Sequence, residues 1–413
     1  MAGPAGDRPL RDARWLAVPE TRRLLGVLAT TGKESRFVGG CVRDTLLHPE
    51  LDPADLDLAT AARPEAVTAR LEAAGIKVVP TGLAHGTVTA LLGERSYEIT
   101  TLRRDVECYG RHAAVEFTED FEADAARRDF TINAMSCDAE GRLYDYFGGR
   151  EDLAAGRVRF VGDPRRRIRE DYLRILRFFR FFARFGRPPA DPEALAACAA
   201  EAGGLDRLSG ERIRQELLRL LVAPGVPAAL DLMAETGVLR HVLPVEIHRD
   251  RLLRLLEIAP EADPILRLAA LIRGPGVDAP KVLALAHRLR LSKRETGRLL
   301  LLTTAPLPDP RAPEAVHKAE IYRRGGRAYA DLLCLAASEG AMDRERLEAL
   351  LALAASWSPP AFPLRGRDLL AAGVAPGPEL GRLLRALETW WLEGGLVADR
   401  TALLAELDRR RGR

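Results

Sequence analysis

Two aspartates spaced two residues apart are the first side chains in the chain that could do chemistry. Asp55 and Asp57 flank Leu56 in the stretch DLDLAT. On a β-strand, residues i and i+2 point to one face, so both carboxylates project together while Leu56 and Leu58 pack behind them. Clustered carboxylates repel one another unless a cation lies between them, and their hard oxygen ligands suit Mg²⁺. Because this spacing also occurs in loops by chance, it indicates a metal site only together with its neighbours.

Two glycines and an arginine precede this pair in the stretch VGGCVRD. Gly39 and Gly40 let the backbone approach a bound group closely, and a helix that starts nearby directs its N–H groups toward phosphate. Arg43 adds a guanidinium fork that suits a triphosphate. A plain tight turn is the alternative interpretation of the two glycines.

A second cluster is the stretch ARRDFTINAM at residues 126–135. We expect Arg127 and Arg128 to contact the phosphate or ribose of a nucleotide, and a surface charge pair with Asp129 is the alternative. Glu98 lies between the clusters in an alternating strand pattern. If its strand joins the same sheet, its carboxylate completes the metal site, and a salt bridge at the sheet edge is the competing interpretation.

The stretch RFFRFFAR, residues 177–184, interleaves arginines with phenylalanines directly behind REDYLRIL. We expect one helix to run from residue 169 through this stretch, with Asp171 and Arg174 on one face. Arg180 then lies on the far side from Asp171, at the periphery or in an ion pair, and Arg177 serves as support or as a phosphate contact. The phenylalanines fill the rest of the circumference, which predicts a buried helix with one polar stripe. An isolated i,i+3 ion pair is the alternative for Asp171 and Arg174.

The elements that position these residues change in type along the chain. Strand patterns occur at 36–38, 56–59, 76–79, 86–92 and 97–102, with a helical pattern at 64–74. After about residue 159, helical patterns rich in Leu, Ala and Arg continue to the end, with a boundary near residues 162–164. The sequence therefore predicts an α/β (α+β) domain with a mixed sheet, followed by an all-α region.

Composition excludes several classes of protein. Of 413 residues, 47% are hydrophobic and 29% charged, and no apolar run is long enough to span a bilayer. The N-terminus does not resemble a signal peptide, and five scattered cysteines form no CxxC pair, which favours a reduced cytoplasmic protein without structural zinc. The net charge of +3 is too small to indicate a nucleic-acid partner, but residues 163–187 hold nine arginines and three acids.

Seven motifs in order give the chain a family resemblance. GGCVRD, DLDLAT, HGTVTALL, YEITTLRRD, RRDFTINAM, EDYLRILR and LSGERIRQEL resemble the class II tRNA nucleotidyltransferases, the CCA-adding enzymes, which share a superfamily with bacterial poly(A) polymerases. The resemblance covers about residues 36–220, and the segment between Arg43 and Asp55 is slightly longer than the family pattern. It implies a head (palm) at 1–160, a nucleotide-recognising neck at 161–240, and an RNA-binding body and tail at 241–413.

The resemblance also implies roles for single residues. Asp55 and Asp57 match the metal-binding pair of a two-ion Mg²⁺ site, and Glu98 matches a strand carboxylate. Residues 102–122 correspond to a flexible loop used in switching from C to A addition. The positions that match nucleotide-binding residues of the family are Gly40, Arg43, Arg128, Asp171, Arg174, Arg177 and Arg180.

The implied reaction is template-independent addition of CCA to tRNA from CTP and ATP. Asp171 would accept from the exocyclic amino group that cytosine and adenine share, and Arg174 would donate to the adjacent ring nitrogen. Uracil presents a carbonyl there and would face Asp171 acceptor to acceptor. The expected partners are tRNA, CTP and ATP in the cytoplasm, without a membrane, and the sequence leaves open a monomer or a homodimer.

Several other functions compete with CCA addition. A poly(A) polymerase shares the head and much of the neck, and CC-only or A-only enzymes are close variants. A catalytically silent RNA-binding protein is the alternative from a different class, but binding alone has no use for clustered carboxylates beside phosphate. An HD-type phosphohydrolase in the helical half is excluded because none of the seven histidines precedes an aspartate.

Overall fold

The structure is a computed structural model that describes residues 9–53, 55–82, 86–109 and 112–412. The chain forms two compact units, Met1–Pro244 and Val245–Arg413. The first unit holds all the strands and the second is helical. The predicted fold class, an α/β domain followed by helices, is therefore confirmed, whereas the finer divisions predicted after residues 160 and 240 stay predictions.

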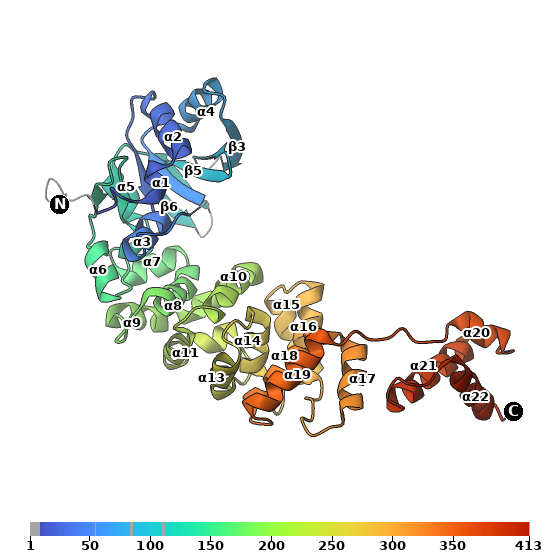
Figure 1. Ribbon diagram of the computed structural model, residues 1–413. Coiled ribbons are helices and arrows are strands. Elements are labelled where there is room, and N and C mark those ends of the chain that lie inside the picture. The colour runs from blue at the N-terminus through green and yellow to red at the C-terminus, as the bar shows by residue number, and fades with distance from the viewer. Residues whose placement is uncertain (1–8, 54, 83–85, 110–111, 413) are drawn as a thin grey trace. The chain divides into compact units, whose positions relative to one another are not determined.

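A seven-stranded mixed sheet organises the first unit, in the order β3-β4-β5-β2-β1-β8-β9 (Figure 1). Strands β2 and β5 pair in parallel, and the other neighbours pair antiparallel. The alternation that predicted the strands is seen in their burial, since Leu56, Leu58 and Tyr97 are fully buried. The strands are β1 (Ser35–Val38), β2 (Asp55–Thr60), β3 (Lys77–Gly82), β4 (Thr87–Leu92), β5 (Arg95–Thr101), β8 (Ser136–Cys137) and β9 (Leu143–Tyr144).

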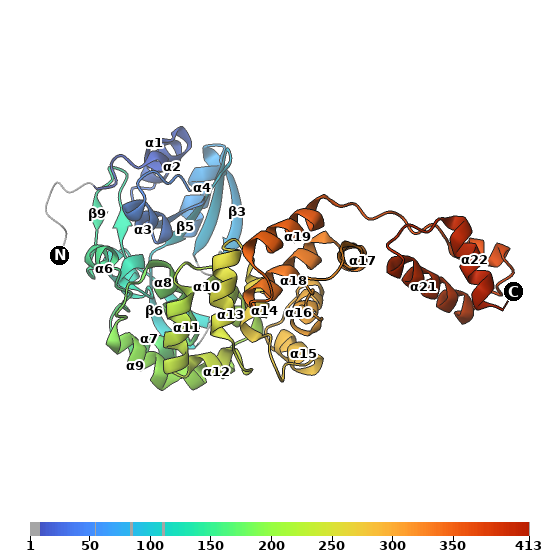
Figure 2. The same cartoon turned by 60° about the horizontal axis from the view of Figure 1, so that its bottom comes forward.

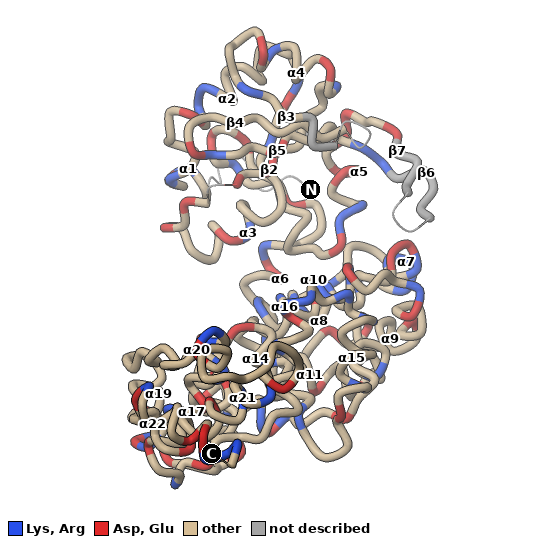
Figure 3. Tube along the Cα trace, turned by 90° about the vertical axis from the view of Figure 1, so that its right-hand side faces the viewer, with Lys and Arg blue, Asp and Glu red and all other residues tan. Residues whose placement is uncertain are grey.

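Three helices and a hairpin complete the region around the sheet. Helix α3 (Gly40–Leu47) begins directly after β1, and α2 (Pro19–Ala29) lies against α4 (Pro64–Ala73). Strands β6 (Arg103–Tyr109) and β7 (His112–Phe117) form a separate two-stranded sheet, in the segment for which a flexible loop is expected (Figure 3). Antiparallel pairing satisfies their backbone groups, which a loop would leave to water.

The rest of the first unit is helical and centres on α8 (Leu173–Phe185), which packs against α10 and α11 (Figure 2). Phe178 and Phe179 of α8 are fully buried, as the interleaved pattern predicts. The other helices are α1 (Arg14–Ala17), α5 (Phe121–Ala126), α6 (Gly149–Ala155), α7 (Pro164–Glu170), α9 (Pro192–Glu201), α10 (Gly210–Leu221), α11 (Val226–Glu235) and α12 (Val238–Val242), with 3₁₀ turns at Thr131–Asn133 and Ala202–Arg207.

The single helix expected from residue 169 onward is wrong. Helix α7 ends at Glu170, and Asp171 has an extended backbone (φ −156°, ψ 107°) before α8 begins at Leu173. The Asp171 carboxylate accepts a hydrogen bond from the Leu173 N–H at 3.2 Å, so its side chain pairs with the first N–H of the new helix. Aspartate competes for backbone groups in this way, which favours a break over helix continuation.

The second unit contains helices α13–α22, several of which begin at an aspartate or serine cap. One of its cores surrounds Trp391, between α17, α21 and α22. Across the described residues, no helix is long and apolar enough to cross a membrane. The helices are α13 (Arg249–Ile258), α14 (Pro264–Ile272), α15 (Ala279–Arg288), α16 (Lys293–Thr304), α17 (Glu314–Arg324), α18 (Gly326–Ser338), α19 (Arg344–Ser356), α20 (Gly366–Ala371), α21 (Pro378–Glu393) and α22 (Arg400–Arg410).

Candidate active site

Three carboxylates lie on one face of the parallel strand pair β2–β5. The register places Asp55 beside Ser96 and Asp57 beside Glu98, on strands that run about 4.8 Å apart. Ser96 Oγ donates to Asp55 Oδ1 at 2.6 Å and fixes that carboxylate. The three carboxylates point away from the apolar core, as the alternation of β2 predicts. We call Asp55, Asp57 and Glu98 the carboxylate cluster.

The charge of the carboxylate cluster is poorly balanced by the protein itself. Burial against the sheet raises the pKa of Asp57. The neighbouring carboxylates of Glu98 and Asp55 raise this pKa further, and the Arg128 guanidinium lowers it. No Lys or Arg of the described residues forms an ion pair with any of the three. The salt bridge considered for Glu98 is therefore not seen, and β5 is an inner strand rather than a sheet edge.

The donor set of the cluster fits a hard divalent cation only when another molecule adds ligands. Within the described parts of the chain, no three His, Cys, Asp or Glu side chains lie close enough together to hold a metal ion. Mg²⁺ is commonly held by one or two carboxylates plus waters and substrate phosphates. Asp55 and Asp57 meet that requirement, and Glu98 lies beside them without forming a compact third ligand.

Gly39 brings the backbone close to both Asp57 and Arg128. Its φ of 73° lies in the left-handed region that favours glycine. A methyl group added at Gly39 would lie 3.4 Å from Arg128 Nη1 and 3.9 Å from Asp57 Oδ2. The turn, the carboxylate and the guanidinium that the sequence singled out separately are thus brought together at the start of α3.

The Arg43 side chain is more buried than expected for an arginine that contacts the phosphates of a nucleotide. Its side chain is 7% exposed, and its guanidinium donates to Asn133 Oδ1 and to Asp44 Oδ1 (Nε, 2.8 Å). It also lies 4.3 Å from the centre of the Phe185 ring. Burial lowers the pKa of Arg43, against the opposing effect of Asp44. A triphosphate contact by Arg43 stays a prediction, as does one by Gly40, whose added Cβ would lie 3.6 Å from Arg43 Nη2.

The paired arginines of the second cluster share an aspartate that sequence reasoning missed. Arg127 Nε donates to Asp124 Oδ1 at 2.8 Å, and Arg128 Nη2 donates to Asp124 Oδ2 at 3.3 Å. The charge pair with Asp129 that was considered for them is therefore wrong. Asp129 instead accepts from Arg177 Nε at 2.7 Å. Asp124 lies three and four residues before its partners, a helical spacing that could have identified it.

The four polar residues predicted to form one stripe, of which Asp171 and Arg174 were expected to contact the base, all have protein partners. We call Asp171, Arg174, Arg177 and Arg180 the neck stripe. Asp171 Oδ2 accepts from Arg212 Nη2 at 2.6 Å, and Arg174 Nη1 donates to Glu170 Oε2 at 2.7 Å. Asp171 and Arg174 therefore do not form the i,i+3 ion pair considered from their spacing.

The other half of the neck stripe joins α8 to the head and to α10. Arg177 holds Asp129, whose pKa is lowered because Arg177 and two hydrogen-bond donors outweigh the effect of burial. Arg180 Nε donates to Glu216 Oε2 of α10 at 2.5 Å, the ion pair considered for it. Arg212 and Glu216 were missed because partners 41 and 36 residues away leave no local spacing signal, whereas Glu170 lies four residues before Arg174, a spacing that could have identified it.

The fold and the carboxylate cluster define a nucleotidyltransferase, and comparison with known proteins agrees. Residues 35–159 match the Poly A polymerase head domain, and residues 190–246 match the probable RNA and SrmB-binding site of polymerase A. Among solved structures, the Bacillus stearothermophilus CCA-adding enzyme in complex with CTP is similar with a TM-score of 0.72 and 29% identity, covering 95% of this chain and 98% of that chain.

Curated relatives are similar along nearly the whole chain. Mitochondrial CCA tRNA nucleotidyltransferase 1 of Mus musculus is 36% identical over 402 residues, 94% of this chain and 89% of the relative. The CCA-adding enzyme of Limosilactobacillus fermentum is 32% identical over 393 residues, 93% of this chain and 94% of the relative. The chain therefore belongs to the CCA-adding tRNA nucleotidyltransferase family, which is generally metal-dependent.

Proposed function

We propose that the protein adds CCA to the 3′ ends of tRNA, using CTP and ATP. The 3′-hydroxyl oxygen of the RNA attacks the α-phosphorus of the nucleotide, forming a new P–O bond. The bond between the α-phosphorus and the bridging oxygen breaks, pyrophosphate leaves, and the hydroxyl proton passes to solvent. The observation that carries this proposal is the carboxylate cluster beside Gly39 and Arg128.

Asp55 and Asp57 would hold two Mg²⁺ ions together with the nucleotide phosphates. Bound there, the ions would lower the pKa of the attacking hydroxyl and neutralise charge on the transferring phosphoryl group. Ser96 fixes the orientation of Asp55. The Arg128 guanidinium lies beside Gly39 and would pair with a phosphate oxygen, and Gly39 would leave room for the phosphates to approach the backbone.

Selection of cytosine and adenine would belong to Asp171 and Arg174. Within the protein, Arg212 holds Asp171 and Glu170 holds Arg174. A carboxylate can accept up to about four hydrogen bonds and a guanidinium carries five donors, so an incoming base would add its amino group and ring nitrogen to the partners that the two side chains already have. A base without the matching donor and acceptor would make neither contact.

The remaining parts of the proposal concern RNA binding and location. The neck at 161–240 would carry base recognition, and the helical body and tail at 241–413 would bind tRNA by shape and phosphate contacts. A cytoplasmic location stays a prediction, and the similar CCA tRNA nucleotidyltransferase 1 of Mus musculus is described as mitochondrial.

A single experiment separates this proposal from its alternatives. The protein is incubated with tRNA that ends before CCA, with CTP, ATP, UTP and GTP supplied singly and together. Two C residues with CTP alone and a complete CCA end with CTP plus ATP are expected. A long A tract with ATP alone would indicate a poly(A) polymerase, arrest after CC a partial enzyme, and unchanged RNA a silent RNA-binding protein.

A further inference from the structure

One buried arginine of α7 contacts both parts of the proposed nucleotide site. Arg167 Nη2 donates to the backbone carbonyl oxygens of Arg127 and Arg128, to the latter at 2.8 Å. Its Nη1 donates to the carboxylate of Glu170, one turn further along α7. Glu170 also holds Arg174, whose Nη1 donates back to the carbonyl oxygen of Arg167 at 2.8 Å. A continuous series of hydrogen bonds therefore joins the backbone of Arg128 to the guanidinium of Arg174.

Helix capping explains only one end of this series. Arg127 directly follows the last residue of α5, and the last carbonyl groups of a helix lack partners within it. A cation at that end also interacts favourably with the helix dipole. The cation here, however, comes from a residue 40 positions later in the chain, and a carboxylate that binds a second arginine holds its other nitrogen. Capping of α5 alone requires neither feature.

The two ends of the series have different tasks in the proposed site. Arg128 lies beside Gly39 and Asp57, where a phosphate would bind, and Arg174 is expected at the base. One sugar joins the base of a nucleotide to its phosphates, so the two arginines must keep a matching separation. Binding groups keep such a geometry when neighbouring hydrogen bonds lock their positions. Arg167 fixes the backbone at one end and, through Glu170, the side chain at the other.

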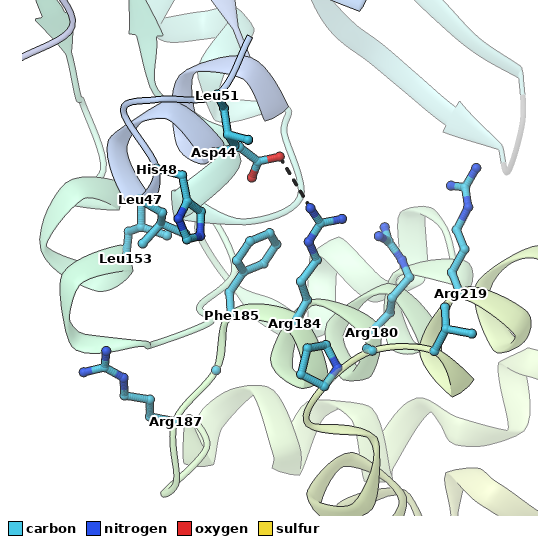
Figure 4. Close-up of a pocket in the computed structure, with 14 residues that line it drawn as sticks. Asp44, Leu47, His48, Leu51, Leu153, Arg180, Arg184, Phe185, Arg187 and Arg219 are labelled. Carbon is cyan, nitrogen blue, oxygen red and sulfur yellow. Dashed lines mark ion pairs between the residues drawn. The ribbon is translucent and has the colours of Figure 1, made fainter. Parts of the chain in front are cut away.

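The contact of α8 with α3 is looser by comparison (Figure 4). Arg184 Nη2, near the end of α8, lies 3.7 Å from Asp44 Oδ2 of α3, and the Arg184 side chain is 56% exposed. The Arg167 side chain is 9% exposed. Exposed ion pairs contribute little because solvent screens them, whereas a buried guanidinium is costly to separate from its partners. Arg167 is therefore better able than Arg184 to hold other groups in a defined position.

We infer that Arg167 is a positioning residue that sets the separation between the phosphate-binding and the base-reading arginines. It contacts neither phosphate nor base. It holds the Arg127–Arg128 backbone and orients Arg174 through Glu170. The inference rests on the proposed function, which supplies the tasks of Arg128 and Arg174. A change at Arg167 therefore affects the binding of CTP and its discrimination from UTP, in addition to stability.

The test compares Arg167→Gln with a matched change in the second unit. Arg267 is buried to the same degree, with 7% of each residue exposed, and it also donates to two backbone carbonyl oxygens, those of Ala262 and Pro260. Both variants should lower the midpoint of thermal unfolding. Incorporation of CTP and UTP is measured on tRNA ending before CCA. We expect Arg167→Gln to weaken the preference for CTP over UTP about 10-fold, the usual effect of a lost hydrogen bond to a charged group, and Arg267→Gln to leave it within about 2-fold.

A double-variant cycle examines whether Arg167 acts through Arg128. Arg128→Gln removes the guanidinium but keeps the backbone carbonyl that Arg167 contacts. The Kd for CTP is measured by equilibrium titration, so that slow variants can be compared. Arg167→Gln should raise this Kd about 10-fold in the wild-type background and less than about 3-fold in the Arg128→Gln background, because residues that act as a unit are not additive.

Arg167→Lys keeps a cation beside Glu170 but cannot reach both carbonyl oxygens as well. It provides the same comparison if Arg167→Gln does not fold, with changes in the same direction. An unchanged CTP/UTP preference in the folded Arg167 variants overturns the inference, as does an equal rise in the Kd for CTP in both backgrounds. Failure of the proposed function is distinct, because the wild-type protein would then incorporate no CTP.

Discussion

The carboxylate cluster and the neck stripe differ in how the protein balances their charges. No cation of the described residues pairs with the cluster, and burial and mutual repulsion raise the pKa of Asp57. Every member of the stripe is paired, and Arg177 even lowers the pKa of its buried partner Asp129. The stripe is therefore held in place by the protein's own side chains, whereas the charge of the cluster is left for a bound cation to balance.

We propose separate tasks for the two regions on the basis of this difference. An unbalanced group of carboxylates gains most from bound divalent cations, which in turn attract phosphate oxygens, and this suits a site of phosphoryl chemistry. Side chains held by ion pairs keep a fixed geometry, which suits the reading of a base edge. Variants of the cluster should then affect the rate of transfer, and variants of the stripe should affect stability or the choice of nucleotide.

The largest effect is expected for Asp57→Asn, which keeps the shape of the side chain but removes its charge. A lost metal carboxylate costs several kcal/mol of transition-state stabilisation, or about 10³-fold in kcat. Incorporation of labelled CTP into tRNA measures it, with thermal unfolding as the test of folding. Asp52→Asn is the matched control, because Asp52 pairs with Arg95 outside the cluster. Near-normal turnover by Asp57→Asn would remove the cluster from the mechanism.

The next effect concerns stability and the joint between head and neck. Asp129→Ala leaves Arg177 without its main partner. We expect the free energy of unfolding to fall by about 3 kcal/mol, the lower end of the usual range for breaking a buried ion pair. The lower end applies because Arg177 can still turn toward Glu216. Chemical denaturation measures the loss, and exposed Glu72→Ala should stay within about 0.5 kcal/mol of wild type.

The same pair has a defined pH dependence. The pKa of Asp129 is lowered on folding, so its contribution is complete above the unfolded pKa of 3.8 and is lost as pH falls through the folded value. The difference between wild type and Asp129→Ala should accordingly be constant near neutral pH and shrink only below about pH 3.8. A difference that shrinks between pH 7 and 5 would contradict the ion pair as its origin.

A smaller effect is expected for Arg212→Gln. This variant releases Asp171 from its partner while leaving the carboxylate in place. We expect the KM for CTP to change about 5-fold and the preference for CTP over UTP to weaken, because a charged hydrogen bond that orients the carboxylate is lost. Arg240→Gln, an exposed change on α12, serves as the control. A loss of stability with unchanged CTP/UTP preference would make Arg212 a structural brace only.

Sequence periodicity predicted which residues share a face of a strand or are buried on a helix, because these properties depend on local geometry. The alternation in DLDLAT placed Asp55 and Asp57 on one face because the burial of β2 also alternates. The phenylalanines of α8 are buried as their interleaving indicates. The break at Asp171 was missed because no Gly or Pro marks it, and the deciding hydrogen bond is donated by the Leu173 N–H to the Asp171 side chain.

Tertiary partners explain most of what the sequence could not show. Arg212 lies 41 residues after Asp171, and Glu216 lies 36 residues after Arg180, so only the packing of α10 against α8 brings them together. The same packing creates a cavity beside α3, which is lined by arginines from two helices and a loop. Sequence spacing predicts contacts between residues about one helical turn apart, and these contacts join residues much farther apart in the sequence.

The most direct test of separate tasks is the 3′-end sequence made by Asp171→Ala from a mixture of CTP and UTP. Without the carboxylate, uracil no longer meets an acceptor facing its own carbonyl. The account predicts that discrimination against UTP falls about 10- to 100-fold, within the 1–3 kcal/mol that one such contact is worth, while transfer remains far faster than in Asp57→Asn. An unchanged CTP/UTP preference, or a loss of transfer as deep as that of Asp57→Asn, would contradict it.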